Sequence, residues 1–373
     1  MNKLLQFISF IFIGLRGFTA SAEVMPVTWR AQSEHVLVVS NITALVPDSY
    51  CLVGADLDTQ SARTQAIIQV LNPTQSTPIW VTHASLNEKD FFQNRFTHCS
   101  AIGDSIYGVE EVDTQSSASL SQTLIFINRF NKEGHCIARK QVVIGTPKPW
   151  SIGLTAIGQT LYLLAGDKET QAKNSFAGMH LISLSSNLED QRSVAIPNGA
   201  FFYPSKMLTL DRGLFLVGPF SKSAQEEDAE LAAARLSLKG KYLWAQHFPY
   251  AANKAIYTLD PQTQEIRASV IRNGVLESQS VNAEGKASNP VVLKSTACRA
   301  LGHLGNLVRP QVLALNCGKP PQVTNTDLAT GTVISFKKLD QKPLKYFDLP
   351  DSVFLVMRSN SDAPEYQFLQ IKK

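Results

Sequence analysis

A short pattern of residues recurs along this chain at intervals of about 50 residues. Each copy begins with an apolar or aromatic run that ends near a glycine, passes through a polar loop into a second apolar run, and closes with turn residues. The four clearest first runs are Tyr50–Gly54, Ile106–Val109, Leu161–Gly166 and Leu214–Gly218. The repeat constrains the fold strongly, because each unit must bury its apolar face against its neighbours.

Three weaker copies, centred near Ile266, Leu313 and Phe354, bring the number of units to seven. Each unit has the pattern of four short strands separated by turn signals. A four-stranded unit with a period of about 40 to 50 residues is typical of a β-propeller. We therefore expect an all-β chain whose residues 23–373 form a single seven-bladed β-propeller of four-stranded antiparallel blades. Residues 224–238 fit either an inserted helical turn or, better, a loop followed by a strand.

The last unit ends at Lys373 without a fourth strand. The N-terminal segment Pro26–Gln32 resembles the fourth strands at Pro78–Val81 and Tyr242–Gln246, since each of the three short segments contains a tryptophan. Pairing this segment with the last blade would cover an edge that is otherwise exposed. We expect the N-terminal strand around Trp29 to close the ring in this way.

The first 22 residues have the three parts of a secretory signal. Lys3 supplies a positive start, Leu4–Leu15 is mostly apolar, and Ala20–Ala22 has the small-residue form of a cleavage site. The apolar run is shorter than the ~20 residues that a membrane-spanning helix needs, although an uncleaved anchor is the alternative. The pattern predicts a periplasmic or secreted protein that begins at Glu23 and has no membrane span.

Two segments carry a resemblance to known repeats. Leu214–Gly218 followed by Ala234–Trp244, and the turn Asp327–Thr332, resemble the blades of secreted bacterial β-propellers of the quinoprotein and outer-membrane-assembly types. The resemblance implies the same fold. Quinoprotein blades usually carry a docking tryptophan soon after this turn, and here that place falls in Ile334–Phe336. Since only one unit keeps the Thr-Gly turn, the resemblance extends to the fold and does not carry a cofactor over to this chain.

The sequence lacks the short motifs that mark common catalytic and cofactor sites. The 35 lysines and arginines are balanced by 31 acidic residues and form no basic run, so a nucleic-acid partner is not expected. There is no nucleophile elbow, phosphate-binding glycine loop, Cys-x-x-Cys pair or histidine pair at ligand spacing, so we expect neither a cofactor nor a metal. His98 and His303 fall on predicted innermost strands and could approach the central channel.

The chain has five cysteines, and an exported protein can form disulfides. Cys298 and Cys317 flank the first two strands of the sixth unit, where they would face each other. We expect this pair to form a disulfide. A bridge between Cys51 and Cys99 on neighbouring blades is a weaker possibility. The alternative is that Cys51, Cys99 and Cys136 are buried reduced thiols.

The segments that link one unit to the next hold most of the conspicuous aromatic residues. In a propeller these links share one face, and aromatic side chains on loops over a rigid scaffold suit recognition of a protein. We therefore expect a monomeric, non-enzymatic protein that binds a protein partner of the cell envelope. The alternative function is an enzyme that acts on polysaccharide or uses a quinone-type cofactor. The alternative role of the aromatic residues is packing between the blades. The expected contact residues are Phe91, Phe92, Trp150, Phe201, Phe202, Tyr203, Phe248 and Tyr250.

Overall fold

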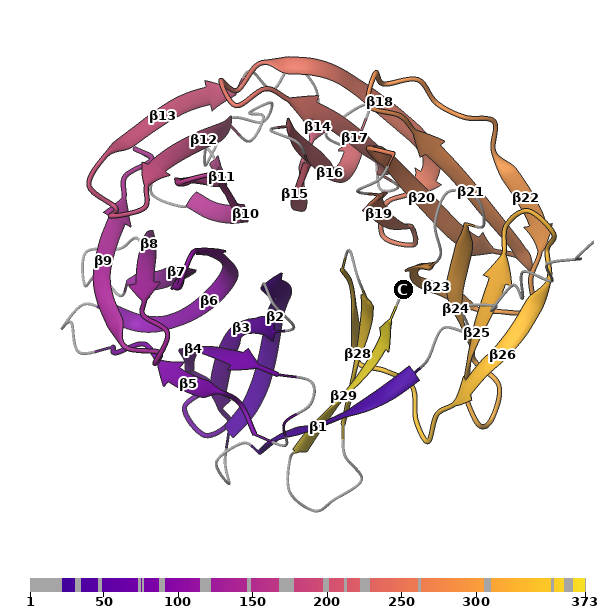
Figure 1. Cartoon of the computed structure of the whole chain (residues 1–373), viewed down its shortest axis with the longest axis horizontal. Helices are drawn as coiled ribbons and strands as arrows, with labels where there is room; N and C mark the ends of the chain where they lie inside the picture. Colours follow the sequence, from indigo (N-terminus) through magenta and orange to yellow (C-terminus); the bar gives the residue numbers. More distant parts are fainter. Residues whose placement is uncertain are drawn as a thin grey trace, which may run out of the picture.

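The protein is a ring of seven antiparallel sheets around a central axis, and its described residues contain no helix (Figure 1). This confirms the seven-bladed β-propeller expected from the repeat. The computed structural model describes residues 22–30, 35–45, 49–72, 75, 77–86, 91–114, 122–145, 149–167, 178–196, 201–210, 213–221, 229–260, 263–304, 310–349, 352–358 and 365–372. The predicted signal peptide, apart from Ala22, lies outside these residues, as do residues 224–228 of the segment that was open to a helical turn.

The blades follow one another along the chain, and in each the strands run in order from the axis outward. Blades 1 to 3 consist of β2 (His35–Leu45), β3 (Ser49–Asp58), β4 (Thr64–Leu71) and β5 (Trp80–His83); β6 (Phe91–Ile102), β7 (Ser105–Thr114), β8 (Thr123–Phe130) and β9 (Cys136–Val142); and β10 (Pro149–Ile157), β11 (Thr160–Asp167), β12 (Gly178–Ser185) and β13 (Gln191–Ile196).

Blade 4 is the irregular one, because two short strands share its innermost position and both pair with the next strand. Blades 4 to 6 consist of β14 (Phe201–Phe202), β15 (Lys206–Leu210), β16 (Gly213–Ser221), β17 (Glu230–Leu236) and β18 (Tyr242–Ala251); β19 (Ile256–Asp260), β20 (Glu265–Arg272), β21 (Val275–Val281) and β22 (Val291–Lys294); and β23 (Arg299–Leu304), β24 (Gln311–Asn316), β25 (Gln322–Asp327) and β26 (Val333–Lys338).

Blade 7 joins the two ends of the chain. It consists of β27 (Lys345–Asp348), β28 (Ser352–Arg358), β29 (Glu365–Lys372) and, as its outermost strand, β1 (Ala22–Arg30). β1 pairs antiparallel with β29, so that Trp29 lies opposite Tyr366, and Figure 1 shows the two strands side by side. The N-terminal strand therefore closes the ring, as the sequence predicted.

The recurring glycine has a structural reason. Innermost strands carry β-bulges, with register shifts after Val39, Phe96, Ser151 and Ala300. A bulge bends the strand toward its neighbour, and a glycine on that neighbour leaves room for it. At Gly54, for example, an added Cβ would collide with the carbonyl oxygen of Val38. The glycine-ended runs of the repeat are the second strands of the blades.

The hydrophobic core lies mainly between neighbouring blades. Between blades 7 and 1, for instance, Phe354 and Phe368 pack with Leu52 and Ile67, and all four side chains are fully buried. Because the first and last blades share such a layer, side chains as well as backbone pairing close the ring. Burial of this apolar surface is the main favourable term in the stability of the fold.

Two disulfides are present. The bond between Cys298 and Cys317 joins the chain before β23 to the chain after β24, with a Cα separation of 5.8 Å, which confirms the expected pair. The bond between Cys51 and Cys99, with a Cα separation of 6.5 Å, joins β3 of blade 1 to β6 of blade 2. Cys136 is an exposed free thiol at the start of β9. Two disulfides indicate an oxidising, exported environment.

Within the described ranges, no helix is long and apolar enough to cross a membrane.

Candidate functional site

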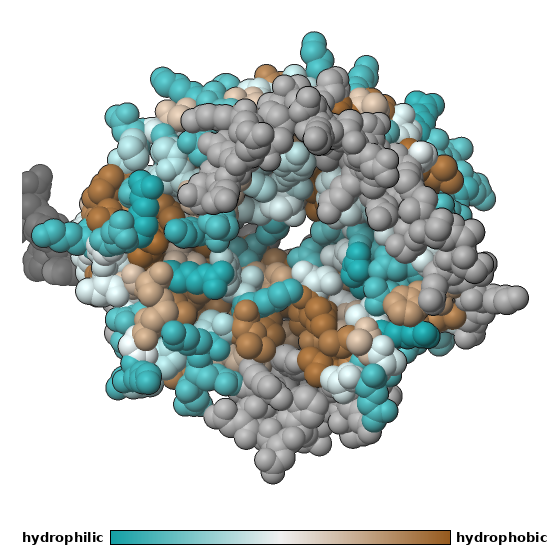
Figure 2. Space-filling view, turned by 180° about the vertical axis from the view of Figure 1, so that it is seen from behind, coloured by the Kyte–Doolittle hydropathy of each residue, from teal (hydrophilic) through white to brown (hydrophobic). Residues whose placement is uncertain are grey.

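A cavity of about 630 Å³ occupies the central channel, and the innermost strands of blades 1 to 5 and 7 line it. It reaches the turn between β6 and β7, where Gly103 and Asp104 belong to its wall. Figure 2 shows the ring from behind, with an opening at its centre. The polar part of the wall consists of Asn41, Thr43, His98, Ser100, Asp104, Thr155, Lys206, Thr209, Tyr257, Thr258 and Asp348.

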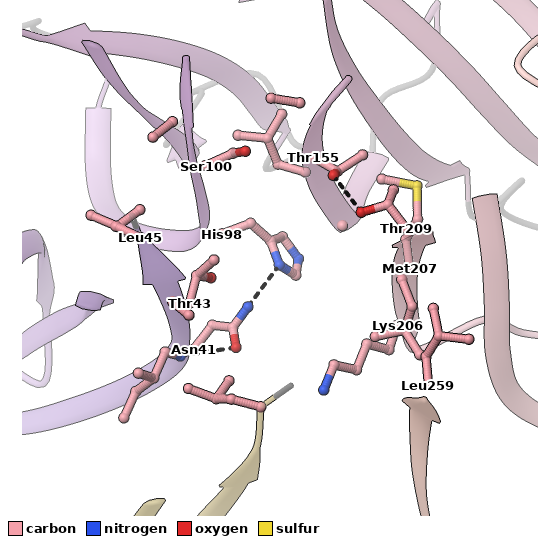
Figure 3. Close-up of a pocket in the computed structure, with 18 of the residues that line it drawn as sticks. Asn41, Thr43, Leu45, His98, Ser100, Thr155, Lys206, Met207, Thr209 and Leu259 are labelled. Atoms are coloured by element: carbon pink, nitrogen blue, oxygen red, sulfur yellow. Dashed lines mark hydrogen bonds between the residues drawn. The ribbon is translucent and has the colours of Figure 1, made fainter. Parts of the chain in front are cut away.

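Two of the bulges place Asn41 and His98 beside each other in the channel. Each residue directly follows the register shift of its own strand, in β2 and β6 respectively. Asn41 accepts a hydrogen bond from the Ile42 backbone N–H at 2.9 Å through Oδ1, so its Nδ2 group is left to donate to His98 Nδ1 at 3.3 Å (Figure 3). A ring nitrogen that accepts must be unprotonated, which assigns the proton of the neutral imidazole to Nε2.

His98 carries no charge at neutral pH. Burial lowers its pKa from 6.5 to about 4, because an imidazolium ion would lose its hydration in the channel. The nearby Glu111 carboxylate and a backbone hydrogen bond with Ser151 raise this pKa, whereas Lys206 lowers it, and burial outweighs them. The histidine is therefore a neutral hydrogen-bonding group of the cavity wall.

Among the described residues of the cavity wall, Lys206 is the one that carries a positive charge. It begins β15, and its side chain extends into the cavity (Figure 3). Its ammonium group donates to the backbone carbonyl of Asp348 at 3.3 Å and lies 5.9 Å from the centre of the Tyr257 ring. Burial raises the pKa of Tyr257, and the Ser205 hydroxyl, 3.3 Å from the phenol oxygen, opposes the rise. The phenol is therefore neutral beside the ammonium.

The Asp348 carboxylate points toward blade 6. Its Oδ2 accepts a hydrogen bond from the His303 backbone N–H at 3.2 Å and lies 3.6 Å from His303 Nδ1. The other ring nitrogen of His303 is 2.8 Å from Ser269 Oγ, and that hydroxyl donates to Ser278 Oγ at 2.8 Å. A polar chain thus runs through the described residues of blades 5, 6 and 7.

This chain has the residue types of a hydrolytic triad, but its position argues against that role. Ser269 is 0% exposed and His303 is 4% exposed, so no substrate can reach the hydroxyl oxygen. A nucleophilic serine must be accessible and must give its proton to the histidine, whereas Ser269 directs its proton to Ser278. The three residues link blades. No sequence motif marks the group, because its members lie far apart along the chain.

Two buried glutamates on β7 hold the strands of blade 2 together, and one of them also links blade 2 to blade 3. Glu111 accepts from the backbone N–H and the hydroxyl of Ser151 in blade 3, each at 2.7 Å, and from Arg95 at 2.6 and 3.0 Å. Glu110, which is fully buried, accepts from Asn94, Asn128 and Arg139 at 2.6 to 3.0 Å. Both carboxylates are saturated with donors, so neither is available for general acid–base chemistry.

The predicted contact aromatics lie at one end of the blades, which we call the connection face: the face where β6, β10 and β14 begin and β5, β9 and β18 end. Phe92 is half-buried beneath the exposed Arg63, whose guanidinium carbon lies 4.5 Å from the ring centre. Phe91 lies 5.5 Å from the guanidinium of Arg139. Trp150 is half-buried against Gly166, and Tyr203 is 36% exposed.

Three of the predicted contact residues are buried. Phe248 and Tyr250 belong to a cluster between blades 4 and 5, and Phe202 packs with Met207 and Leu216. These side chains pack inside the protein, which is the alternative role considered for the aromatics. Burial also raises the pKa of Tyr250 to about 12. The side chain of Phe201 lies outside the described residues, as do those of Ile334–Phe336.

Of the two histidines expected near the channel, His98 lines the cavity and His303 is buried behind it. In the part of the chain that the structure describes, no group of three or more His, Cys, Asp or Glu residues could hold a metal ion.

No known protein family matches this chain, and no curated protein matches its sequence. Solved structures do match its fold. The β-propeller domain of the Trilobed protease from Pyrococcus furiosus aligns over 90% of this chain and 93% of that one, at 8% identity and a TM-score of 0.52. A puromycin-hydrolysing peptidase from Mycobacterium tuberculosis aligns over 93% of this chain at 11% identity and a TM-score of 0.53.

The α-L-arabinofuranosidase Arb93A from Fusarium graminearum aligns over 84% of this chain and 99% of that one, at 13% identity and a TM-score of 0.51. This chain spans about half of the M. tuberculosis peptidase, 55%, and of a Pyrococcus horikoshii acylaminoacyl peptidase, 52%. At such low identities the likeness concerns the fold alone, since one fold hosts many unrelated functions.

Proposed function

We propose that this protein is a non-enzymatic binding protein of an exported compartment, the periplasm if the producing cell has one, and that it holds another protein on its connection face. The observation that carries the proposal is the set of partly exposed aromatic side chains there: Phe91, Phe92, Trp150 and Tyr203. Two of them lie beside an arginine. Aromatic residues and arginine are enriched at the cores of protein interfaces, and tryptophan, tyrosine and arginine are enriched among the few residues that dominate the binding energy.

The scaffold beneath these residues supports the proposal. The Cys51–Cys99 bond joins blade 1 to blade 2, and Glu111 joins blade 2 to Ser151 in blade 3. Phe92 lies at the start of β6 and Trp150 at the start of β10, the two strands that contain Cys99 and Ser151. Side chains held in place before binding lose less conformational entropy when a partner arrives.

An enzyme that acts on polysaccharide or uses a quinone-type cofactor is the second possibility, and it has less support. Glycoside hydrolysis needs two carboxyl groups that flank one bond. The two acids of the described cavity wall are Asp104, exposed on a turn, and Asp348, whose carboxylate contacts His303. The imidazole of His98 is neutral and bonded to Asn41.

The test compares two double variants in pull-downs from a periplasmic extract. In Phe92→Ala with Tyr203→Ala we expect the amount of captured partner to fall at least about tenfold, as for truncated interface hot spots. The control, Ile137→Ala with Leu243→Ala, removes two side chains near the starts of β9 and β18, at the opposite end of the blades, that are 53% and 54% exposed, and it should capture as much as the parent. Equal capture by both variants, with unchanged melting temperatures, would refute the proposal.

A further inference from the structure

We infer that the central cavity is a second binding site, separate from the connection face, and that it takes a small organic anion: a hydroxyl-bearing molecule with one carboxylate or phosphate group that Lys206 receives.

The dimensions of the cavity fit such a ligand. Its volume of about 630 Å³ lies within the range of about 300 to 1,000 Å³ that small-molecule sites occupy. Its wall is built from strands, with Thr43 on β2, Thr155 on β10 and Thr209 on β15. Sites built on strands hold their groups more firmly than sites built on loops.

Lys206 gives the cavity a group that attracts an anion. Among the described residues that line the cavity, Lys206 is the one positively charged side chain, because His98 is neutral. An ammonium group has three N–H donors, so it can keep its bond to the Asp348 carbonyl and still bind a ligand oxygen. Lys206 is partly buried, and the attraction between a partly buried ammonium group and an anion is stronger than that between fully exposed charges.

The wall also contains two acidic residues. The Asp348 carboxylate is directed to the His303 backbone, and Asp104 is an exposed residue at the β6–β7 turn. The backbone carbonyl oxygen of Asp348 accepts a hydrogen bond from the ammonium group, whereas carboxylate Oδ2 accepts from the His303 backbone.

The remaining polar groups suit a ligand with hydroxyls. Thr155 and Thr209 face each other with their hydroxyl oxygens 2.9 Å apart (Figure 3). When one hydroxyl of such a pair donates to the other, the second proton can turn to an acceptor on a ligand. Thr43 and Ser100 add two more hydroxyls to the wall. Hydroxyl side chains both donate and accept, so they match a polyhydroxylated molecule without fixing its charge.

The test is calorimetric titration of the full protein with two matched pairs of probes: D-glucuronate against D-glucose, and glycerol 3-phosphate against glycerol. We expect at least one acidic probe to bind about tenfold or more tightly than its neutral partner, as a desolvated charge contact implies. The pair that shows the difference tells whether the site prefers a carboxylate or a phosphate.

Variants place the binding at Lys206. In Lys206→Gln the preference for the acidic probe should disappear, in Lys206→Arg it should persist, and in Lys254→Gln, an exposed lysine between β18 and β19, it should be unchanged. Thr209→Val should weaken the acidic and neutral probes alike, and it keeps the test decisive if Lys206→Gln unfolds. Absence of binding by both acids at about 10 mM, a Kd of poor small-molecule sites, or an acid preference that survives in Lys206→Gln, would overturn the inference.

Discussion

The indole of Trp244 in blade 4 packs against Gly285 in blade 5, so closely that a Cβ atom on the glycine would lie 2.7 Å from the ring. The indole N–H also donates to the carbonyl of Ala283 at 2.7 Å. Trp80 of blade 1 meets Gly134 of blade 2 in the same way, with 2.6 Å between the ring and an added Cβ. The outer strand of one blade thus docks on the last turn of the next.

This contact predicts that Gly285→Ala destabilises the protein by about 2 to 4 kcal/mol, since the methyl group adds a clash to an unfavourable backbone conformation. Gly274→Ala is the matched control, because both glycines have positive φ values, 85° and 75°, but the nearest atom to a Cβ at Gly274 is 3.7 Å away. We expect the control to cost about 1 kcal/mol. Urea unfolding measures both, and equal losses would contradict the docking role of Trp244.

The Glu111 carboxylate provides the second prediction. Glu111→Gln turns an amide donor toward the donors of Arg95 or Ser151, so we expect a loss of about 2 to 4 kcal/mol in the free energy of unfolding. Glu277→Gln is the control, because it breaks a pair with Arg272, whose side chain is 49% exposed, and should cost less than about 1 kcal/mol. If the two variants were equally stable, Glu111 would not be a link between blades 2 and 3.

The lowered pKa of His98 predicts a pH dependence. Between pH 6.5 and about 4 the unfolded chain binds a proton at this residue and the folded protein does not, so the stability falls as the pH falls. The difference amounts to at most about 3 kcal/mol at the acidic end of this window. In His98→Asn this contribution should vanish, and urea unfolding of both proteins from pH 7.5 to 4 measures it. Parallel pH profiles would show that His98 titrates normally.

The cysteines predict the result of a thiol assay. Without reductant, the unfolded protein should contain one reactive thiol, that of Cys136. Although Cys136 is exposed, neighbouring atoms partly desolvate its sulfur and raise the pKa of the thiol. The thiol should therefore react more slowly at pH 8 in the folded protein than in the unfolded one, because the thiolate is the reactive form. Three or five reactive thiols would contradict one or both of the disulfides.

The sequence predicted the ring, its closure by β1 and the Cys298–Cys317 bond, because each depends on local pattern and strand order. It did not predict that bulges would bring Asn41 and His98 together, since one extra residue in a strand leaves no composition signal. Nor did it reveal the contact between Ser269 and His303, which lie on different blades.

The burial of Phe248 and Tyr250 could have been recognised from the sequence. Side chains alternate along a strand, so in β18 both residues lie on the same side as Trp244, which packs toward blade 5. Reading these residues as loop aromatics missed this alternation, because β18 extends farther than the repeat suggested. Phe92 and Tyr203 are partly exposed, so their substitution can distinguish a role in partner recognition from a role in packing.

Photo-crosslinking in cells tests most directly whether the connection face binds a protein partner. A photoreactive amino acid is placed at position 92 on the connection face in one protein, and at position 137, which is 53% exposed on the outer strand β9, in another. We predict a discrete covalent complex with one protein from position 92 and none from position 137. Adducts that are absent from position 92, or identical from both positions, would contradict the proposal that the connection face binds a protein partner.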